Sequence, residues 1–233
     1  MIGAQCGLGG RVDQRGDKRH GVCSNSEVRS SSKASGVTQR PKNAVFIAGA
    51  TASGKSALAL ALAAARDGVV INADSMQLYR DLAILTGRPS AVDEARAPHR
   101  LYGAIDGAKR CSVAHWRDLA LGAIEEAWRQ ERLPILVGGT GLYFRVLATG
   151  IATIPDIPAD VRAAVRALLA AEGPQALHRR LAQVDAASAA RLAPGDRQRL
   201  ARAWEVWQAT GTPLSGWQQA KAAGGLAARS DVR

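Results

Sequence analysis

The chain has 233 residues, of which 47% are hydrophobic and 22% are charged. This apolar content is enough for one substantial domain and a small accessory one, and it excludes a collagen-like or wholly disordered chain. Lys and Arg number 31 against 20 Asp and Glu, and the resulting net charge of +11 favours a polyanionic partner.

The first part of the chain, residues 1–40, lacks hydrophobic periodicity and is rich in Gly, Ser and Arg. It holds no apolar stretch of signal-peptide length, so we predict a disordered N-terminal extension. Elsewhere, apolar runs are interrupted well before the length of about 18 residues that a membrane span needs, so no membrane partner is expected. The three cysteines have neither disulfide nor zinc-site spacing, which favours a reducing, cytoplasmic location.

Residues 41–150 alternate short apolar runs with helical patterns, and Gly-rich turns separate several of them. The predicted strands are 44–48, 69–71, 134–137 and a weaker one at 101–105, and the predicted helices are 56–66 and 112–130. Strands that alternate with helices form a parallel sheet, because a parallel connection needs a crossover long enough for a helix. We therefore predict an α/β core over these residues.

The chain changes character after Gly150, where no convincing strand follows. Helices are predicted at 159–172, 174–184 and 196–210. Asp196 is suited to begin the last of these helices, and Gly211 is suited to end it. Residues 151–212 are therefore expected to form a helical accessory segment. Residues 213–233 are expected to be a truncated return to the core that ends in a frayed tail, because residues 222–225 show no packing pattern.

A phosphate-binding motif, G-x-x-x-x-G-K-S, lies between the first predicted strand and the helix that follows it. Its glycines let the backbone wrap an anion with successive N–H groups, and the helix start adds the positive end of its dipole. The lysine adds a mobile positive charge, and the serine hydroxyl is suited to Mg²⁺. The motif predicts binding of a diphosphate or triphosphate without identifying the reaction. Its residues are Gly49, Ala50, Thr51, Ala52, Ser53, Gly54, Lys55 and Ser56.

Two further polar positions follow predicted strands and belong to the same edge of a parallel sheet. The run 138–141 offers Thr140 as a donor to a phosphate oxygen, although a simple strand-to-helix turn has the same spacing. Asp74 follows the strand at 69–71 and has three candidate roles. It holds Mg²⁺ through water, it acts as a general base, or it caps a short turn, and spacing alone does not choose among these roles.

Five motifs that occur in order carry a resemblance to a known family. They are the phosphate-binding motif at 49–56, DSMQLY at 74–79, PHRL at 98–101, VGGTGLY at 137–143 and QRLARAWEV at 198–206. The first is unspecific by itself, whereas the set of five in register is highly specific. Together they resemble the tRNA dimethylallyltransferases, the tRNA isopentenyltransferase family, over residues 42–218. The resemblance implies a P-loop NTPase-like core.

The family transfers a dimethylallyl group from dimethylallyl diphosphate to N6 of the adenine adjacent to the anticodon in tRNA. Diphosphate leaves, and Mg²⁺ assists. By this resemblance Asp74 is the general base that takes a proton from the adenine amine, a poor nucleophile that benefits from such help. The larger task is to stabilise the departing diphosphate, which suits Thr51, Lys55, Ser56 with Mg²⁺, and Thr140.

The resemblance also implies contacts with the tRNA anticodon arm. Segment 74–77 would meet the target adenine, which must leave its stack to reach the diphosphate. Segment 151–212 would grip the arm mainly through its phosphates. Without the family, the basic flank of the predicted helix at 196–210 would be interpreted as a solvated face. The implied tRNA-binding residues are Asp74, Ser75, Met76, Gln77, Thr140, Arg162, Gln198, Arg199, Leu200, Ala201 and Arg202.

The sequence also departs from the family pattern. Residues 86–89 replace a Gly-Thr-Ala-Lys-Pro-like stretch, and Ala50 replaces the usual proline. Family members continue well beyond the position of Arg233, so we expect a C-terminally truncated chain. Other functions stay open: a P-loop small-molecule kinase that binds ATP, a prenyltransferase acting on free adenylates, or an inactive relic that binds diphosphate or RNA. We expect the protein to be a monomer.

Overall fold

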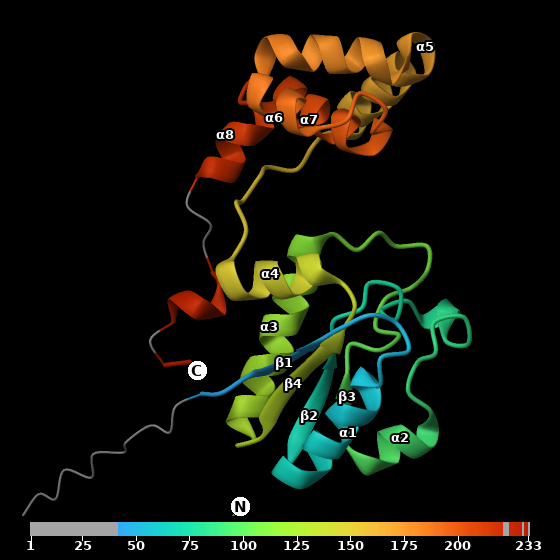
Figure 1. Cartoon of the computed structure of the whole chain (residues 1–233), viewed down its shortest axis with the longest axis vertical. Coiled ribbons are helices and arrows are strands. Elements are labelled where there is room, and N and C mark those ends of the chain that lie inside the picture. The colour runs from blue at the N-terminus through green and yellow to red at the C-terminus, as the bar shows by residue number, and fades with distance from the viewer. Residues whose placement is uncertain (1–41, 221–223, 230, 233) are drawn as a thin grey trace, which may run out of the picture. The chain divides into compact units, whose positions relative to one another are not determined.

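The computed structural model of the chain describes residues 42–220, 224–229 and 231–232. The extension predicted at 1–40 and residues 221–223, 230 and 233 of the predicted tail lie outside the described residues. The described part contains an α/β core in residues 42–150 and a helical segment in residues 151–220 (Figure 1).

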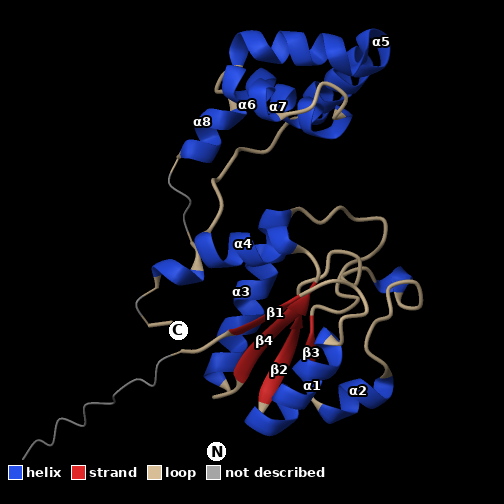
Figure 2. Ribbon diagram, in the orientation of Figure 1, coloured by secondary structure: helices blue, strands red, loops and turns tan. Residues whose placement is uncertain are grey.

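The core is built on a four-stranded parallel sheet with the strand order β1-β4-β2-β3 (Figure 2). Its strands are β1 (Val45–Ala48), β2 (Gly68–Asn72), β3 (His99–Arg100) and β4 (Leu133–Gly138). Ile135 of β4 is in register with Val45 on one side and with Val70 on the other. The carboxyl ends of β1, β4 and β2 therefore meet at one edge, and the predicted parallel α/β sheet is confirmed.

Helices cover both faces of the sheet (Figure 1). They are α1 (Lys55–Arg66), α2 (Ala91–Arg96), α3 (Val113–Arg129) and α4 (Gly141–Thr149), with the 3-10 turn η1 (Arg80–Leu82) between β2 and α2. Because side chains alternate along a strand, Val70 packs with Leu60 of α1, whereas Ile71 belongs to the cluster of Trp116 and Leu147. The core thus has α1 on one face and α3 and α4 on the other.

The helical segment has an apolar core of its own. Its helices are α5 (Ala159–Val184), α6 (Ala186–Arg191), α7 (Arg197–Thr210) and α8 (Leu214–Gln219). Gly173 has a φ of 79° and kinks α5 where the sequence predicts a break between two helices. Asp196 caps the start of α7 and Gly211, with a φ of 67°, ends it, as predicted. None of the described helices combines the length and hydropathy that crossing a membrane requires.

The weaker strand predicted at 101–105 is wrong. The third strand is β3, which ends before these residues because Leu101 has a φ of 65° and leaves the extended conformation. Ile105 pairs only with Tyr79, as an isolated bridge. The helices α2, α4, α6 and α8 are absent from the prediction. The six residues of α2, α6 and α8 and the nine of α4 are too few to show a clear hydrophobic period.

The end of the described chain packs on the core, so only the expected fraying from residue 222 onward is corrected, and only for residues 224–229 and 231–232. Leu226 begins the 3-10 turn η2 (Leu226–Ala228), is 4% exposed and joins the apolar cluster of α3 and α4. Arg229 forms ion pairs with Glu125 of α3 and with Asp231. A buried leucine and paired charges therefore fix this segment against α3.

Candidate active site

The phosphate-binding motif forms the turn between β1 and α1, as predicted. Ala52 and Gly54 have φ values of 62° and 80°, so the loop backbone uses left-handed conformations at two positions. Gly54 is the N-cap of α1, and no side chain caps the first N–H groups of this helix. Uncapped N–H groups at the positive end of a helix dipole are suited to bind an anion.

Lys55 and Ser56 open α1 and give the loop its functional groups. The Lys55 ammonium donates a 2.7 Å hydrogen bond to the Ala50 carbonyl oxygen, so its positive charge lies across the loop. Ser56 is exposed and lines a cavity beside the loop. The cation and the hydroxyl that the motif predicts for phosphate binding therefore lie at one helix start.

Three loops meet at the carboxyl edge of the sheet. Gly49 follows β1, Asp74 follows β2 and Gly139 follows β4. A Cβ atom added at Gly139 would lie 3.6 Å from the Gly49 carbonyl oxygen and 3.7 Å from Oδ2 of Asp74. The strand order thus brings together the phosphate loop, the acid and the second Gly-rich loop that the sequence predicts to share this edge.

A buried amide fixes the backbone around Asp74. Asn72, at the end of β2, is 0% exposed, and its side chain donates to the carbonyl oxygens of Asp74 at 2.9 Å and Leu101 at 3.1 Å. Its Oδ1 accepts the Asp74 N–H at 2.8 Å. Oδ1 of Asp74 in turn accepts the Met76 N–H at 2.9 Å, so Asp74 does cap a short turn. Within the described residues no hydrogen bond reaches Asp74 Oδ2.

Thr140 holds this turn against the second Gly-rich loop. Its hydroxyl oxygen accepts the Ser75 N–H at 3.1 Å, and its own N–H donates to the Ala73 carbonyl oxygen at 3.3 Å. The side chain is half-buried at the start of α4. Thr140 therefore ties the loop after β4 to the turn after β2, while its contact with a phosphate stays a prediction.

A cavity of about 250 Å³ extends from Ser56 along the α1 face of the sheet. One wall is apolar and consists of small and branched side chains from α1 and β2. The other wall is polar and comes from the loops around α2 and β3. The lining residues are Ser56, Ala57, Leu60, Val70, Gly87, Arg88, Pro89, Asp93, Arg96, His99 and Tyr102.

Two residues of the polar wall have environments suited to an anionic ligand. Burial, and next the nearby carboxylate of Asp74, raise the pKa of the Tyr102 phenol, which therefore stays a neutral hydrogen-bond donor. The Arg88 guanidinium lies against the backbone of Gly103 and donates to the Arg80 carbonyl oxygen at 3.2 Å. Its Nε is buried and has no partner within the described residues. The guanidinium as a whole lines the cavity, and its positive charge is suited to an anion there.

The side chains available as metal ligands limit how a metal ion would be held. The described residues contain no group of three or more His, Cys, Asp or Glu side chains that could bind a metal ion. Mg²⁺ usually keeps several waters and binds through few protein ligands together with substrate phosphates, so Ser56 fits it in that way only. The predicted Mg²⁺ stays a prediction.

The tRNA contacts predicted outside the core lie on α5 and α7. Arg162 is half-buried in the first turn of α5, and Gln198 and Arg202 are exposed on α7. Leu200 is 0% exposed and packs inside the helical segment, so its side chain is not on an RNA-facing surface and that prediction is corrected. Arg199, also exposed, keeps its place among the candidates.

Three residues around the site are missing from the predicted set: Asn72, Arg88 and Tyr102. Asn72 carries a usable signal, because an amide that ends a wholly apolar strand has to be hydrogen-bonded. The other two carry none. They reach the cavity through loops whose path depends on the left-handed Gly87 and Gly103, both with a φ of 59°.

Comparison with known proteins places this geometry in a family. A family model described as "IPP transferase" matches residues 77–231, and one described as "Isopentenyl transferase" matches residues 42–109. The tRNA dimethylallyltransferase of Granulibacter bethesdensis is 59% identical over 179 residues, which cover 77% of this chain and 56% of the relative. That of Rhodopseudomonas palustris (strain BisB5) is 60% identical over 179 residues, which cover 77% of this chain and 55% of the relative.

Among solved structures, one of a eukaryotic dimethylallyltransferase acting on tRNA has a TM-score of 0.67 and is 27% identical. That match covers 82% of this chain and 47% of the other. The chain spans about half the length of the curated relatives it matches. Because the first family model covers most of its residues, the chain belongs to the IPP transferase family.

Proposed function

We propose that the protein transfers a dimethylallyl group from dimethylallyl diphosphate to N6 of the adenine adjacent to the anticodon in tRNA. The observation that carries this proposal is the meeting of Gly49, Asp74 and Gly139, because it joins a phosphate loop and a carboxylate at one sheet edge. The family of the chain supports the type of reaction, and the names of its relatives support tRNA as the acceptor and dimethylallyl as the transferred group.

The reaction forms a bond between N6 and the allylic carbon and breaks the bond between that carbon and a diphosphate oxygen. Both electrons of the broken bond leave with diphosphate, and N6 loses one proton. Asp74 is suited to accept that proton at Oδ2, since the Met76 N–H already occupies Oδ1. A base here assists an amine whose lone pair is delocalised into the adenine ring.

The negative charge that develops on the diphosphate is stabilised by the start of α1. Lys55 exchanges its bond to the Ala50 carbonyl for a diphosphate oxygen, and the uncapped N–H groups of the helix add further donors. Mg²⁺, held by Ser56 and the diphosphate itself, would add positive charge to the leaving group. These groups strengthen their contacts as the leaving group gains charge, so they lower the barrier as well as bind the donor.

The cavity beside Ser56 supports an allylic donor of this size. Its apolar wall, formed by Ala57, Leu60 and Val70, suits a branched five-carbon group, and burial is worth about 0.8 kcal/mol for each methylene-sized unit. Tyr102 lines the same cavity and lies near enough to Asp74 for the carboxylate to affect its pKa. We infer that the cavity holds the dimethylallyl group beside the proposed base.

The helical segment supplies the proposed grip on the tRNA anticodon arm. Arg162, Gln198, Arg199 and Arg202 are polar or cationic side chains on α5 and α7, and contacts to phosphates need no particular base sequence. The net charge of +11 favours such a partner over the whole chain.

The test is mass spectrometry of nucleosides from unmodified tRNA after incubation with the protein, Mg²⁺ and dimethylallyl diphosphate. We expect prenylated adenosine from the unaltered chain, and a rate at least about 100-fold lower for Asp74→Asn, the scale of lost general-base catalysis. Asp118→Asn is the matched control, because this carboxylate is exposed on α3 and, among the residues that the structure describes, pairs only with its neighbour Arg117. Equal rates for the three proteins would reject Asp74 as the base. No product from folded, unaltered protein would reject the activity for this chain and favour an inactive relic.

A further inference from the structure

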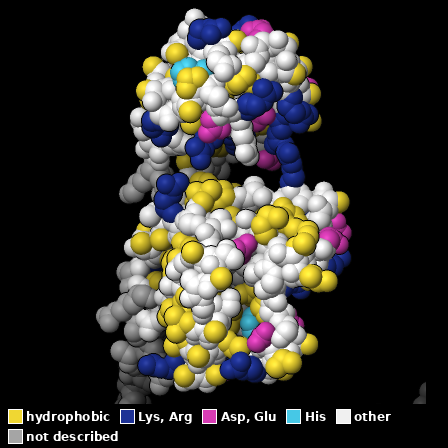
Figure 3. Space-filling view, turned by 45° about the vertical axis from the view of Figure 1, so that its right-hand side comes forward, with side chains coloured by type: hydrophobic (Ala, Val, Ile, Leu, Met, Phe, Trp, Pro, Cys, Tyr) yellow, Lys and Arg dark blue, Asp and Glu magenta, His cyan; other side chains and the backbone are white. Residues whose placement is uncertain are grey.

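Two adjacent apolar side chains in the turn after η1 are almost fully exposed to solvent. Ile84 is 95% exposed and Leu85 is 85% exposed, which makes them the most exposed large apolar side chains of the described residues. Met76, beside Asp74, is 51% exposed as well. Hydrophobic side chains gather on this side of the α/β core in the space-filling view (Figure 3). Clustered exposure of this kind marks a contact surface.

Hydrogen bonds hold the turn that carries Ile84 and Leu85 in one shape. The N–H and the hydroxyl of Thr86 both donate to the Leu82 carbonyl oxygen, at 3.1 Å and 2.7 Å. The Arg88 N–H donates to the Ala83 carbonyl oxygen at 3.2 Å. Ile84 and Leu85, called the apolar tip below, therefore lie on a hydrogen-bonded turn. This turn is already ordered before a partner binds.

The same turn is tied to the proposed catalytic acid. The Gln77 side-chain amide donates to the Thr86 carbonyl oxygen at 2.8 Å. Gln77 follows Met76, whose N–H is bonded to the Asp74 carboxylate. Only one hydrogen bond and the short segment 74–77 thus separate the apolar tip from Asp74.

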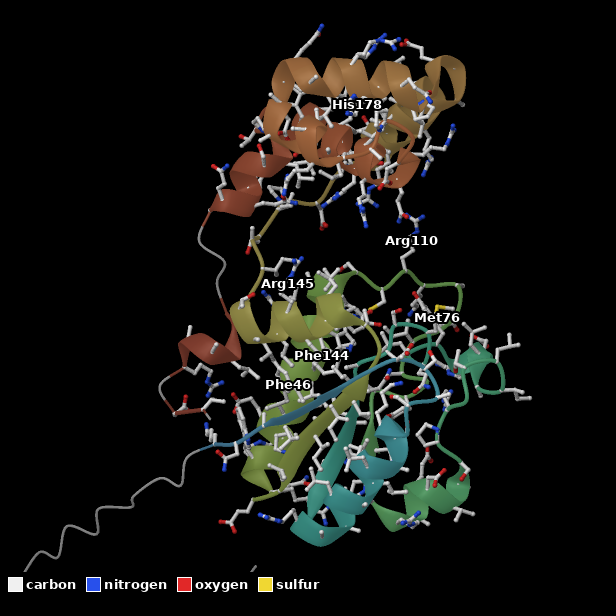
Figure 4. All side chains as sticks on the ribbon, viewed as in Figure 1. Phe46, Met76, Arg110, Phe144, Arg145 and His178 are labelled. Carbon is white, nitrogen blue, oxygen red and sulfur yellow. The ribbon has the colours of Figure 1, made fainter. Side chains whose placement is uncertain are left out.

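Cations stand on a neighbouring loop. The Arg80 N–H donates to the Ile105 carbonyl oxygen at 2.8 Å, and the Cys111 N–H donates to the Tyr79 hydroxyl at 3.3 Å, so the loop between them runs beside η1. Arg110, in this loop, is exposed and pairs with no carboxylate among the described residues. Arg110 and Met76 project from the same end of the core (Figure 4).

We propose that Ile84 and Leu85 form an apolar wedge that packs against an unstacked base of an RNA loop and keeps the target adenine out of its stack. The proposal rests on the proposed function, since it needs RNA at Asp74. Aliphatic side chains can enter between bases and unstack them, and nearby cations such as Arg110 bind the flanking phosphates. A second copy of this chain or another protein would explain the apolar tip but neither the cation nor the tie to Asp74.

The experiment uses the full chain and an RNA anticodon stem–loop in which 2-aminopurine replaces the target adenine. Fluorescence of 2-aminopurine rises when the base leaves its stack. The variants are Ile84→Ser/Leu85→Ser and, as matched control, Val92→Ser, which is 71% exposed on α2. Because all three side chains are exposed, the variants are expected to fold like the unaltered chain, and circular dichroism checks this.

We expect the unaltered chain and Val92→Ser to raise the fluorescence at saturating protein, and the double variant to give at least a threefold smaller rise. With unmodified tRNA, kcat/KM for the RNA should fall about tenfold in the double variant, while KM for dimethylallyl diphosphate stays unchanged. A double variant within twofold of the unaltered chain in both measurements overturns the wedge. The wedge is also overturned if the unaltered chain and Val92→Ser form a concentration-dependent dimer and the double variant stays monomeric, since Ile84 and Leu85 then form a protein interface. An unaltered chain that neither binds the stem–loop nor forms product rejects the proposed function instead.

Discussion

A residue that takes no part in the chemistry decides where Asp74 lies. Asn72 is fully buried, and both ends of its amide are used: Nδ2 donates to two carbonyl oxygens and Oδ1 accepts the Asp74 N–H. Its own carbonyl oxygen accepts the indole N–H of Trp116 at 3.1 Å. A satisfied buried amide is rigid, because any movement leaves a polar atom unpaired at a cost of about 1–3 kcal/mol. Asn72 thus fixes the backbone of Asp74, the proposed base.

Arg88 is the residue at which ligand binding and stability are expected to oppose each other. Its buried Nε lacks a partner in the described residues, so Arg88→Met should leave the free energy of unfolding unchanged or raise it by about 1 kcal/mol. The same change should raise KM for dimethylallyl diphosphate about tenfold, because a cation that lines the proposed donor cavity is lost. Urea unfolding and steady-state kinetics measure the two effects. Arg88→Lys, which keeps the charge, should raise this KM by a smaller factor than Arg88→Met does. An unchanged KM in both variants would exclude Arg88 from the donor site.

At the scale of elements, the end of β4 passes so close to the chain after β2 that only glycine fits. A Cβ at Gly138 would lie 2.1 Å from the carbonyl oxygen of Ala73 and 2.7 Å from the backbone nitrogen of Asp74. Backbone atoms cannot turn aside as the end of a side chain can. The approach that brings the second Gly-rich loop to Asp74 therefore depends on the missing side chain.

Gly138→Ala is expected to lower the free energy of unfolding by about 2–3 kcal/mol, the cost of overpacking, and to weaken donor binding by moving Asp74. Gly122→Ala is the matched control. It lies within α3, a Cβ there meets nothing within 4 Å, and alanine in a helix interior should add about 0.5–1 kcal/mol. Chemical denaturation of both variants checks the opposite signs, and a neutral Gly138→Ala would contradict the close approach.

Asp185 joins two elements of the helical segment. It is 3% exposed, Oδ1 caps α6 by accepting the Ser188 N–H at 2.9 Å, and Oδ2 accepts the Ser215 N–H of α8 at 3.1 Å. Burial acts to raise the pKa of this carboxyl, but the hydrogen bonds from Ser215 and Ser188 outweigh it and the pKa is lowered. The ionised form is thus the one that the folded segment favours.

A lowered pKa fixes the direction of the pH dependence. The contribution of Asp185 should be fully present above its ordinary pKa of 3.8 and be lost as the pH falls through the lower folded-state pKa. Asp185→Ala should destabilise the helical segment by about 2 kcal/mol at pH 7 through loss of both acceptor sites, and by less in acid. Hydrogen exchange of α6 and α8 at pH 7 and pH 3 measures the difference. An equal effect at both values would contradict the lowered pKa.

At the scale of the whole molecule, what the sequence could predict follows from the range of the interactions involved. The phosphate loop and Asp74 depend on local patterns, a glycine-rich turn and the ends of apolar strands, and their shared sheet edge was predictable from topology. The path of residues 101–105 depends on the positive φ of Leu101, which no propensity indicates for a branched side chain. The burial of Leu226 depends on a contact with helices far earlier in the chain. Sequence patterns therefore predict neither an unusual backbone conformation at a single residue nor a contact between residues far apart in the chain.

The three apolar clusters lead to the last prediction. One cluster consists wholly of residues of the helical segment, and the other two consist wholly of residues of the core, its terminal Leu226 and Val232 included. Since these clusters of the described residues share no apolar side chain, the helical segment and the core should open as separate cooperative units. Leu181→Ala, in the helical cluster, should cost about 3 kcal/mol and speed hydrogen exchange in α5 to α7 only. Ile124→Ala, its equally buried counterpart on α3, should cost about as much and speed exchange in the sheet and α3 only. Mass-resolved hydrogen exchange of both variants checks this, and loss of protection across all elements in either one would show a single cooperative unit.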